Sequence, residues 1–211
     1  MSENGKNALL IFVKNPLKGK VKSRLAEGIG EEKALEVYEL LLQHTCNICR
    51  EVEADKFVFY ADFIPEKDIW NGSVYYKYMQ EGSDLGERMK RAFKVIFNFG
   101  YKNVVIIGSD CYELRFDEIK MAFNLLQNTK VVIGPAKDGG YYLLGLNQEF
   151  PDLFEGIPWS TSNVLEKTVE KLDQLKTSFT MLSVLNDIDT ESDLPVDIQN
   201  KIGLRKTQES F

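Results

Sequence analysis

The sequence has few of the residues on which many enzymes build their active sites. Its 211 residues include one histidine and three cysteines. His44 lies within "YELLLQHTCNICREV", a stretch with helical periodicity that is far in sequence from any candidate nucleophile. A Ser-His-Asp or Cys-His mechanism would have to recruit it, so we expect a helix-surface or hydrogen-bonded core histidine instead. Catalysis in this chain must therefore depend on carboxylates, cations, hydroxyls or a bound metal.

The cysteines do not form a recognisable metal or redox site. Cys46 and Cys49 make a C-x-x-C inside the predicted helix, but no second pair follows, and a buried helix face is the better interpretation. Three cysteines fit a reducing compartment. The N-terminus lacks the features of a signal peptide, and no apolar stretch reaches the length of a membrane span. We therefore expect a cytoplasmic protein without a membrane-spanning helix.

The chain is acidic overall, but one segment is rich in positive charge. The chain carries a net charge of −6, which argues against a general nucleic-acid binder. The segment "KNPLKGKVKSRL" (14–25) nevertheless contains five cations. It has neither the two glycines of a Walker A loop nor the three of a dinucleotide fingerprint. Such a segment suits a small polyphosphate anion, and the alternative, a solvated basic surface, stays open on this segment alone.

Strands and helices alternate along the chain. Short apolar runs predict strands, and longer runs with a 3.6-residue period predict helices. The expected strands are 8–13, 56–61, 74–79, 103–108, 130–134, 141–146 and 179–185; the expected helices are 31–53, 84–100 with Gly100 as its C-terminal cap, 116–127, 161–176 capped by Thr161 or Ser162, and a short terminal helix within 191–201. This alternation is typical of an α/β fold with a mostly parallel sheet between two helix layers. The link between 134 and 141 leaves no room for a crossover helix, so one strand is expected to run antiparallel. We expect one domain over residues 1–200 and a polar tail at 201–211.

Aspartates follow two of the predicted strands. Ligands of open α/β sheets bind beyond the carboxyl ends of the strands. Asp110 follows the strand 103–108, and Asp187 and Asp189 follow the last strand two residues apart, hence on one side of an extended backbone. Three carboxylates in one cleft would repel one another unless a divalent cation lay between them, and oxygen ligands suit Mg2+ or Mn2+. Each aspartate taken singly is also explained by capping, for which Asp189 and Thr190 are both suited.

Two further loops offer polar groups. Asp138, Gly139 and Gly140 follow the strand 130–134. The two glycines permit a close backbone approach to a ligand, and a plain hairpin turn explains them as well. Residues 160–162 offer three hydroxyls ahead of a predicted helix. A helix N-terminus suits an anion, although capping alone is an equally good interpretation.

Six segments together resemble the nucleotide-diphospho-sugar transferase superfamily, which has the GT-A fold. They are "FVKNPLKGKVKSRLA", "QEGSDLGERM", "IIGSDCYEL", "GPAKDGGYYLLGL", "WSTSNVLEKT" and "DIDTESDL", in this order. Within the superfamily the chain is similar to the small radical-SAM/selenodomain-associated transferase family, often labelled glycosyltransferase, and more distantly to 2-phospho-lactate guanylyltransferase. The resemblance covers residues 8–195. It implies a single-domain, Rossmann-like three-layer sandwich, with nucleotide binding in the N-terminal half and acceptor binding in the C-terminal half.

The resemblance also implies roles for individual residues. The nucleotide phosphates would be contacted by Lys14, Lys22 and Arg24, with Gln80, Gly82 and Arg88 near the base or the phosphates. Asp110 would be the first ligand of Mg2+ or Mn2+, and Asp187 and Asp189 would complete the metal site. Asp138 and Gly139 would face the acceptor, and we add Gly140, Ser160 and Thr161 to that side. As catalytic residues we expect Asp110 and Asp138.

One position departs from the pattern of the family. Tyr112 stands where the family usually has a proline after "GSDC" or "GTDS", and where many glycosyltransferases of this fold have the second aspartate of Asp-x-Asp. The double-glycine nucleotide loop of sugar-nucleotide pyrophosphorylases is also missing. The departure puts the turn after Asp110 in question more than the metal itself.

The sequence therefore predicts a Mg2+-dependent transferase with a nucleotide donor and a small-molecule acceptor. Glycosyl transfer from a nucleotide-diphospho-sugar is our first interpretation. The alternative is nucleotidyl transfer from a nucleoside triphosphate to a phosphorylated small molecule. A second alternative is a non-catalytic nucleotide-binding regulator, which gains weight if Tyr112 distorts its loop so that Asp110 cannot reach the metal.

Overall fold

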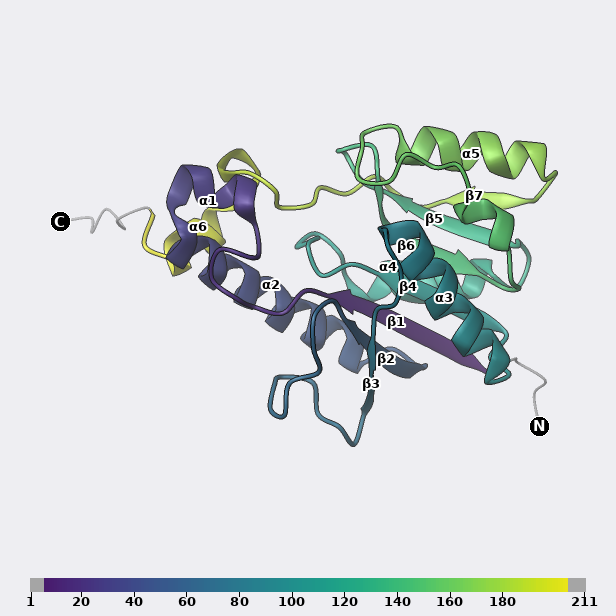
Figure 1. The fold of residues 1–211 in the computed structure, drawn as a ribbon, viewed down its shortest axis with the longest axis horizontal. Coiled ribbons are helices and arrows are strands. Elements are labelled where there is room, and N and C mark those ends of the chain that lie inside the picture. The colour runs from purple at the N-terminus through teal and green to yellow at the C-terminus, as the bar shows by residue number, and fades with distance from the viewer. Residues whose placement is uncertain (1–5, 205–211) are drawn as a thin grey trace.

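A seven-stranded sheet forms the centre of the protein (Figure 1). The computed structural model describes residues 6–204. The strands are β1 (Asn7–Val13), β2 (Asp55–Tyr60), β3 (Tyr75–Met79), β4 (Asn103–Ile107), β5 (Val131–Pro135), β6 (Tyr141–Leu146) and β7 (Phe179–Met181), and their order across the sheet is β3-β2-β1-β4-β6-β5-β7. Strands β1, β2, β4 and β5 are almost wholly buried, as expected of apolar runs in a sheet covered on both faces.

Strand β6 is the antiparallel member of the sheet. It pairs antiparallel with both β4 and β5, whereas the pairs β1–β2, β1–β4, β2–β3 and β5–β7 are parallel. The five residues between β5 and β6 suffice only for a tight return, because a parallel crossover needs a dozen or more. The predicted mixed, mostly parallel α/β sheet is confirmed.

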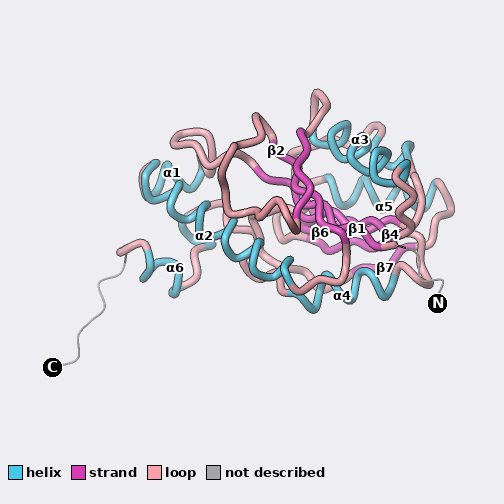
Figure 2. The backbone as a smooth tube through the Cα atoms, turned by 90° about the horizontal axis from the view of Figure 1, so that it is seen from below, coloured by secondary structure: helices cyan, strands magenta, loops and turns pink. Residues whose placement is uncertain are grey.

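Helices cover both faces of the sheet (Figure 2). The longer helices are α2 (Glu31–Arg50), α3 (Leu85–Asn98), α4 (Phe116–Leu125) and α5 (Val164–Gln174); the short ones are α1 (Ser23–Ile29), α6 (Val196–Lys201) and the 3₁₀ turns η1 (Pro151–Phe154) and η2 (Glu191–Asp193). Helices α2 and α4 pack on one face, and α3, η1 and α5 pack on the other. The result is the predicted three-layer sandwich.

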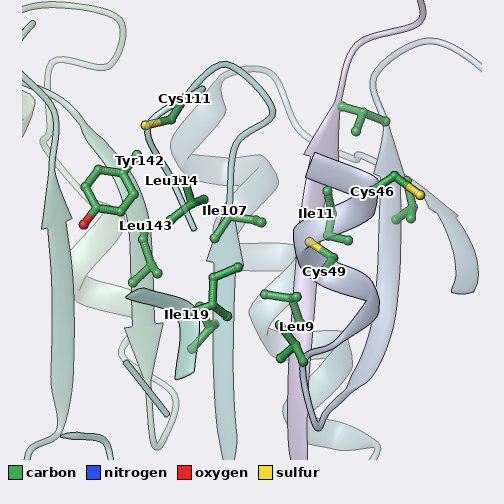
Figure 3. Close-up of a cluster of buried hydrophobic side chains, with 14 of the residues drawn as sticks. Leu9, Ile11, Cys46, Cys49, Ile107, Cys111, Leu114, Ile119, Tyr142 and Leu143 are labelled. Carbon is green, nitrogen blue, oxygen red and sulfur yellow. The ribbon is translucent and has the colours of Figure 1, made fainter. Parts of the chain in front are cut away.

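The cysteines lie in the core under α2 and α4 (Figure 3). Cys46 and Cys49 are buried and free, and they pack with side chains of β1 such as Leu9 and Ile11. Burial raises the pKa of the Cys49 thiol far above its usual range, so no thiolate is available there. The interpretation of the C-x-x-C as a buried helix face is confirmed. His44, on the same helix, contacts the Leu114 carbonyl through Nε2 at 2.8 Å.

A third, smaller core joins helices α1 and α2 to the C-terminal segment. It contains Leu25 of α1, Val37 and Leu41 of α2, Ile188 of the segment before η2, and Ile198 of α6. In Figure 1 the yellow C-terminal segment accordingly crosses the molecule and lies beside α1. Residues 202–204, at the start of the expected polar tail, also pack here through Ile202 and Leu204, and residues 205–211 lie outside the described part.

Several element boundaries differ from the sequence prediction. Helix α1 was not expected, because its few apolar side chains are buried by the C-terminal segment and not by a periodic face of its own. Strand β7 ends at Met181 and not at 185, and only a single bridge follows, between Ala136 and Leu185, after the register of β5 shifts at Pro135. Of the helices within residues 6–204, none is long and apolar enough to cross a membrane.

Candidate active site

A cleft of about 650 Å³ opens where the strands β1 to β4 end and β6 begins. Of the predicted site residues, it is lined by Lys14, Arg24, Gln80, Arg88, Asp110, Asp138, Gly140, Ser160, Thr161, Asp187 and Asp189. Lys22 lines a smaller adjoining pocket together with Lys14, Arg24, Asp110 and Asp189. The loops named in the sequence analysis therefore converge at one edge of the sheet, as open α/β sheets require.

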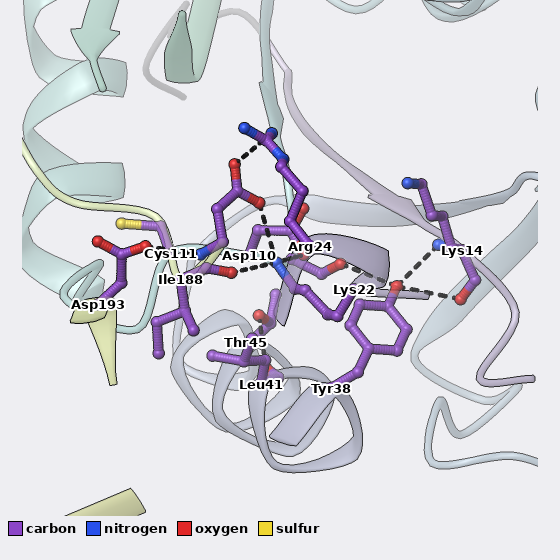
Figure 4. A network of polar contacts seen from close by, with 12 residues as sticks. Lys14, Lys22, Arg24, Tyr38, Leu41, Thr45, Asp110, Cys111, Ile188 and Asp193 are labelled. Carbon is purple, nitrogen blue, oxygen red and sulfur yellow. Dashed lines mark hydrogen bonds and ion pairs between the residues drawn. The ribbon is translucent and has the colours of Figure 1, made fainter. Parts of the chain in front are cut away.

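The ammonium of Lys22 lies among the predicted metal ligands (Figure 4). Its side chain is only 4% exposed, and Nζ is 2.8 Å from Asp110 Oδ1 and 3.8 Å from Asp189 Oδ1. Nζ also donates to the Ile188 carbonyl at 2.6 Å. Lys22 precedes α1 in the left-handed conformation, with φ of 51°, a conformation that costs a non-glycine residue some strain. The contacts of its ammonium stabilise this backbone.

The second cation of the motif, Arg24, is held by Asp189. Its Nη2 lies 2.7 Å from Asp189 Oδ2, and its side chain is otherwise exposed. The loop that carries Asp189 is fixed by Asp193, whose Oδ2 accepts the N–H groups of Asp189 and Thr190. Thr190 caps the turn η2, as one of the two capping interpretations predicted. Asp189 thus has a defined position and a charged partner.

Asp187 carries an unpaired, enclosed oxygen. Within residues 6–204, its Oδ1 is buried and has no hydrogen-bond partner. Burial raises the pKa of this carboxyl group to about 7, and the negative charges of Asp110 and Asp138 add to the rise, while Lys22 opposes it. A buried acceptor without a donor is costly, so such an atom indicates a missing partner.

The three aspartates fit a divalent cation only in part. Their oxygen-only donor set and the unpaired oxygen of Asp187 suit Mg2+ or Mn2+. In the described part of the chain, however, no three carboxylate, histidine or cysteine side chains are gathered closely enough to hold a metal. The Lys22 ammonium supplies the positive charge there instead. A metal could take these ligands if Lys22 gave up its contact with Asp110.

Gln80 and Gly82 have structural partners at the other side of the cleft. Gln80 Nε2 donates to the carbonyls of Val13 and Phe59 at 3.1 and 2.9 Å, which ties together the ends of β1, β2 and β3. Arg88 donates to the Gly82 carbonyl at 3.2 Å and approaches Gln80 Oε1 at 3.5 Å. A Cβ on Gly82 would lie 2.8 Å from the backbone nitrogen of Arg88. Gly82 itself lines neither pocket; it lets the loop pack closely on α3.

The β5–β6 loop is clamped to the segment before α5. Gly139 adopts φ of 89°, and a Cβ there would lie 2.0 Å from the Ser162 carbonyl oxygen. The Gly139 carbonyl accepts the Leu165 N–H at 2.8 Å. Asp138 Oδ1 accepts the Gly140 N–H at 2.8 Å and its carboxyl group lines the cleft. Gly139 thus allows a close backbone approach, but to another part of the protein, whereas Gly140 lines the cleft.

The helix after residues 160–162 begins later than predicted. Its N-cap position is Asn163, so the expectation of Thr161 or Ser162 as N-cap is wrong. Thr161 Oγ1 instead donates to the Pro158 carbonyl and accepts the Asn163 N–H at 3.3 Å, which forms a turn ahead of the helix. Ser160, at φ of 63°, and Thr161 both line the cleft.

Three residues that position the site were not predicted. The Tyr38 hydroxyl accepts the Lys14 N–H at 2.8 Å, donates to the Lys14 carbonyl and contacts Ser109 Oγ. The buried Asn15 side chain bonds to the backbone of residues 62–63 and so holds the next part of the loop. Trp159 lines the cleft. The sequence marks Tyr38 only as part of an apolar helical stripe, because the partner of its hydroxyl is remote in sequence.

Tyr112 does not disturb the position of Asp110. Its hydroxyl donates to Asp197 at 2.6 Å, and its ring lies 4.8 Å from that of His44 and packs against the small core between α1, α2 and the C-terminal segment. Asp110 lines the cleft, and its backbone carbonyl accepts the Ile188 N–H at 3.0 Å. With Tyr112 in its loop, Asp110 therefore still lies in the cleft.

Solved structures similar to this one share its fold. A proposed nucleotide-diphospho-sugar transferase from Desulfovibrio desulfuricans is 34% identical, with 92% of this chain and 90% of that chain covered, and a TM-score of 0.83. Two more distant structures show likeness of fold alone. They are the inositol-1-phosphate CTP transferase of T. maritima (11% identity, full coverage of both chains, TM-score 0.58) and the glucosyl-3-phosphoglycerate synthase of Mycobacterium tuberculosis with Mn2+ and UDP (11%, 95% and 76% covered, TM-score 0.55).

Sequence comparison gives the family of the chain. Among curated proteins, none matches. The family model described as "Uncharacterized protein conserved in bacteria (DUF2064)" matches residues 45–161, which is more than half of the sequence and includes Gln80, Arg88, Asp110 and Asp138. Together with the 34% identity over most of its length to the Desulfovibrio structure, this match shows that the chain belongs to the DUF2064 family.

Proposed function

We propose that this protein is a nucleotide-dependent transferase that moves a glycosyl group from a nucleotide-diphospho-sugar to a small acceptor. The observation that supports it most is the shared cleft of about 650 Å³, in which cations and aspartates face one space. Lys14, Arg24 and Arg88 line it, as do Asp110 and Asp187. The Desulfovibrio relative with the same proposed class of activity supports the same choice of donor.

The diphosphate binds on the side of the cleft that carries the cations. Lys14 and Arg24 come from the segment after β1, and Arg88 comes from α3. Arg24 is exposed and can give a two-point contact to a phosphate, whereas Lys14 supplies a mobile point charge. Because Tyr38 and Asn15 fix the backbone of this segment, the cations are held near one place before any ligand binds.

The chemical step needs a leaving diphosphate and an activated hydroxyl. The bond between the anomeric carbon and the diphosphate oxygen breaks, and a new bond forms from that carbon to the acceptor oxygen. The proton of the acceptor hydroxyl passes to the carboxylate of Asp138, which lines the cleft, and from there to solvent. Lys14, Arg24 and Arg88 stabilise the negative charge on the departing nucleoside diphosphate.

A divalent cation would be held by Asp110, Asp187 and Asp189. When bound, it would neutralise charge on the leaving diphosphate. Lys22 would then lose its contact with Asp110, and its ammonium would become free for the phosphates, as the resemblance implies. In the structure, Lys22 and Arg24 offset the negative charge of Asp110 and Asp189.

Thermal-shift titrations test the choice of donor. Matched mono-, di- and triphosphates of each base and a set of nucleotide-diphospho-sugars are added with Mg2+ or Mn2+. We expect the largest rise in Tm from a diphosphate or a sugar nucleotide, roughly 5–10 °C at a hundredfold excess over Kd. A rise that is largest with a triphosphate, together with pyrophosphate release on addition of phosphorylated acceptors, would establish nucleotidyl transfer instead. No rise with any nucleotide would overturn the proposal.

A further inference from the structure

The half of the cleft opposite the basic segment has a distinct lining. It is formed by the β5–β6 loop, by Tyr141 at the start of β6 and by the segment 159–164 that leads into α5. Side chains from these elements give the space one carboxyl group, hydroxyls and two aromatic rings, from Asp138, Tyr141, Trp159, Ser160 and Thr161. Under the proposed function, this is the half that receives the acceptor.

Among the residues that the structure describes, this half contributes carboxylate to the cleft lining and no cation, whereas the donor half contributes all the cations of the lining, together with Asp84. Asp138 lines it, and Asp187 borders it. Of the residues between 6 and 204 that line the cleft, the basic ones are Lys14, Arg24 and Arg88, none of them on the elements of the acceptor half. Arg88 is also directed elsewhere, because its guanidinium donates to the Gly82 carbonyl. Lys137, on the same loop, is exposed and does not line the cleft, so an anionic group beside Asp138 would meet repulsion without a cation of the cleft lining to offset it.

The N-terminus of α5 does not offset this charge. Free N–H groups at a helix N-terminus attract anions, but here protein oxygens accept the N–H groups of three successive residues. The Leu165 N–H donates to the Gly139 carbonyl, the Val164 N–H to the Thr161 carbonyl, and the Asn163 N–H to Thr161 Oγ1. Glu166 adds a further negative charge in the first turn. The helix end is therefore a structural joint and not a phosphate site.

Trp159 forms a rigid aromatic wall in this half. Its ring is half-buried, meets Tyr141 edge-on at 6.5 Å and stacks on Phe154 at 6.3 Å. It also lies on the backbone of α3, since a Cβ on Gly86 would be 2.0 Å from Trp159 Nε1. An aromatic face of this kind attracts cations and packs against the apolar C–H face of a sugar ring. The wall is preorganised, because three neighbours fix the ring.

We infer that the acceptor is an uncharged or positively charged hydroxyl compound, held against Trp159 with Asp138 beside its hydroxyl, and that phosphorylated acceptors are excluded. The inference rests on the proposed function, which assigns this half to the acceptor. What it states physically is that the electrostatic potential at Trp159 is negative. A negative potential there distinguishes the protein from transferases whose acceptors carry a phosphate, and it argues against nucleotidyl transfer to such an acceptor.

Collisional quenching of Trp159 fluorescence measures the sign of the potential directly. The chain has two tryptophans, and Trp70 is only 2% exposed, so ions in solution reach Trp159 far more easily. We expect caesium to quench the protein more strongly than iodide, each relative to N-acetyltryptophanamide, and Trp159→Phe to remove the quenchable part. Asp138→Asn should lower the caesium-to-iodide ratio. Asp173→Asn, which removes an exposed carboxylate from the far end of α5, is the matched control and should leave the ratio unchanged.

Two results would overturn the inference from quenching. One is stronger relative quenching by iodide than by caesium in the wild-type protein. The other is an equal effect of Asp138→Asn and Asp173→Asn on the ratio. Because the measurement needs no nucleotide, it succeeds or fails independently of the thermal-shift titrations that test the donor.

Matched acceptor pairs test the chemical consequence. With the sugar nucleotide that gives the largest thermal shift, nucleoside diphosphate release is followed with a hexose and its 6-phosphate, and with a polyol and its phosphate. We expect the unphosphorylated member of a pair to give release at least about tenfold faster. Faster release with the phosphorylated member would contradict the inference, even if the donor is the one proposed.

Discussion

Lys22 neutralises part of the negative charge at the predicted metal site. A buried ammonium that touches Asp110 and the Ile188 carbonyl cannot be removed without leaving a carboxylate unpaired among others. The residue also binds the segment after β1 to the C-terminal segment. One side chain thus links charge balance at the site with the position of two loops that are far apart in the sequence.

Replacing the Lys22 side chain should lower the stability of the fold and strengthen metal binding. We expect Lys22→Met to lower the free energy of unfolding by about 1–3 kcal/mol, less than for a fully buried pair, because Asp110 is 43% exposed. Chemical denaturation with and without Mn2+ measures it, and Mn2+ should restore more stability to the variant than to the wild type. Lys18→Met, which breaks only an exposed pair with Glu32, is the control. Equal stability of both variants would contradict this account of Lys22.

Asp187 should make stability depend on pH. Its pKa in the folded protein is about 7 and about 3.9 in an unfolded chain, so folding favours the protonated form. Its contribution to stability is fully present below pH 4 and is lost as the pH rises to 7 and above. Asp187→Asn should therefore be more stable than the wild type at pH 8, by at most about 4 kcal/mol, and similar to it at pH 4.

Denaturation curves at pH 4, 6 and 8 give this comparison. Added Mg2+ should stabilise the wild type at pH 8 and have a smaller effect on Asp187→Asn, because the variant lacks one anionic ligand. A variant that is no more stable than the wild type at pH 8 would show that Asp187 is ionised without cost in the folded protein.

The sequence predicts which residues gather at the site better than it predicts what they contact. Asp110, Asp138, Asp187 and Arg24 all line the cleft, because each follows a strand or begins the helix after one. The contact of Lys22 with Asp110 was not foreseen, since a left-handed backbone at a lysine has no signal in the sequence. Side-chain partners depend on the final tertiary packing, which no local pattern encodes.

At the scale of elements, helix α3 and the segment before α5 support each other through Gly86 and Trp159. Gly86→Ala should raise the intrinsic helix propensity of α3 but push the Trp159 ring away, since its added Cβ would overlap Nε1. We expect a shift in Trp159 emission and a higher acceptor KM, with donor affinity changed less than about twofold. Gly72→Ala, at a position with open space around its Cβ, is the control. An unchanged emission spectrum in Gly86→Ala would contradict the close packing.

The sequence predicted an element correctly where its apolar residues form a continuous run or recur with a regular period. The strands β1 and β4 are continuous apolar runs, and α2 and α3 have apolar faces of regular period. The prediction missed helix α1, because the stability of this helix comes from a distant segment. It also placed the end of β7 too late, because Pro135 lacks the N–H that would continue the β5–β7 hydrogen bonds. The sequence thus identifies elements that are amphipathic or buried along their length and misses those formed by long-range contacts.

At the scale of the whole molecule, the order of the strands places the cations on one side of the cleft and Asp138 on the other. The ends of β1, β2 and β3 carry the cations and their supports, and the loops around β5 and β6 carry Asp138 and the aromatic wall. Asp110 and Asp187 lie where the halves meet, so a ligand that spans both must pass the aspartates. This arrangement is what a two-substrate transferase needs, and a simple anion-binding surface would lack the second half.

Calorimetry of nucleoside diphosphate binding in the presence of Mn2+ tests the central claim most directly. With the base that gives the largest thermal shift, we expect Arg24→Ala to weaken binding by roughly 1.5–3 kcal/mol, the cost of a charge-assisted hydrogen bond. Lys18→Ala should bind like the wild type, because Lys18 contacts only Glu32 at the surface. Asp110→Asn should bind the nucleotide with little or no dependence on Mn2+. Equal affinities for Arg24→Ala and Lys18→Ala, with a full response of Asp110→Asn to Mn2+, would show that the nucleotide does not bind at this cleft.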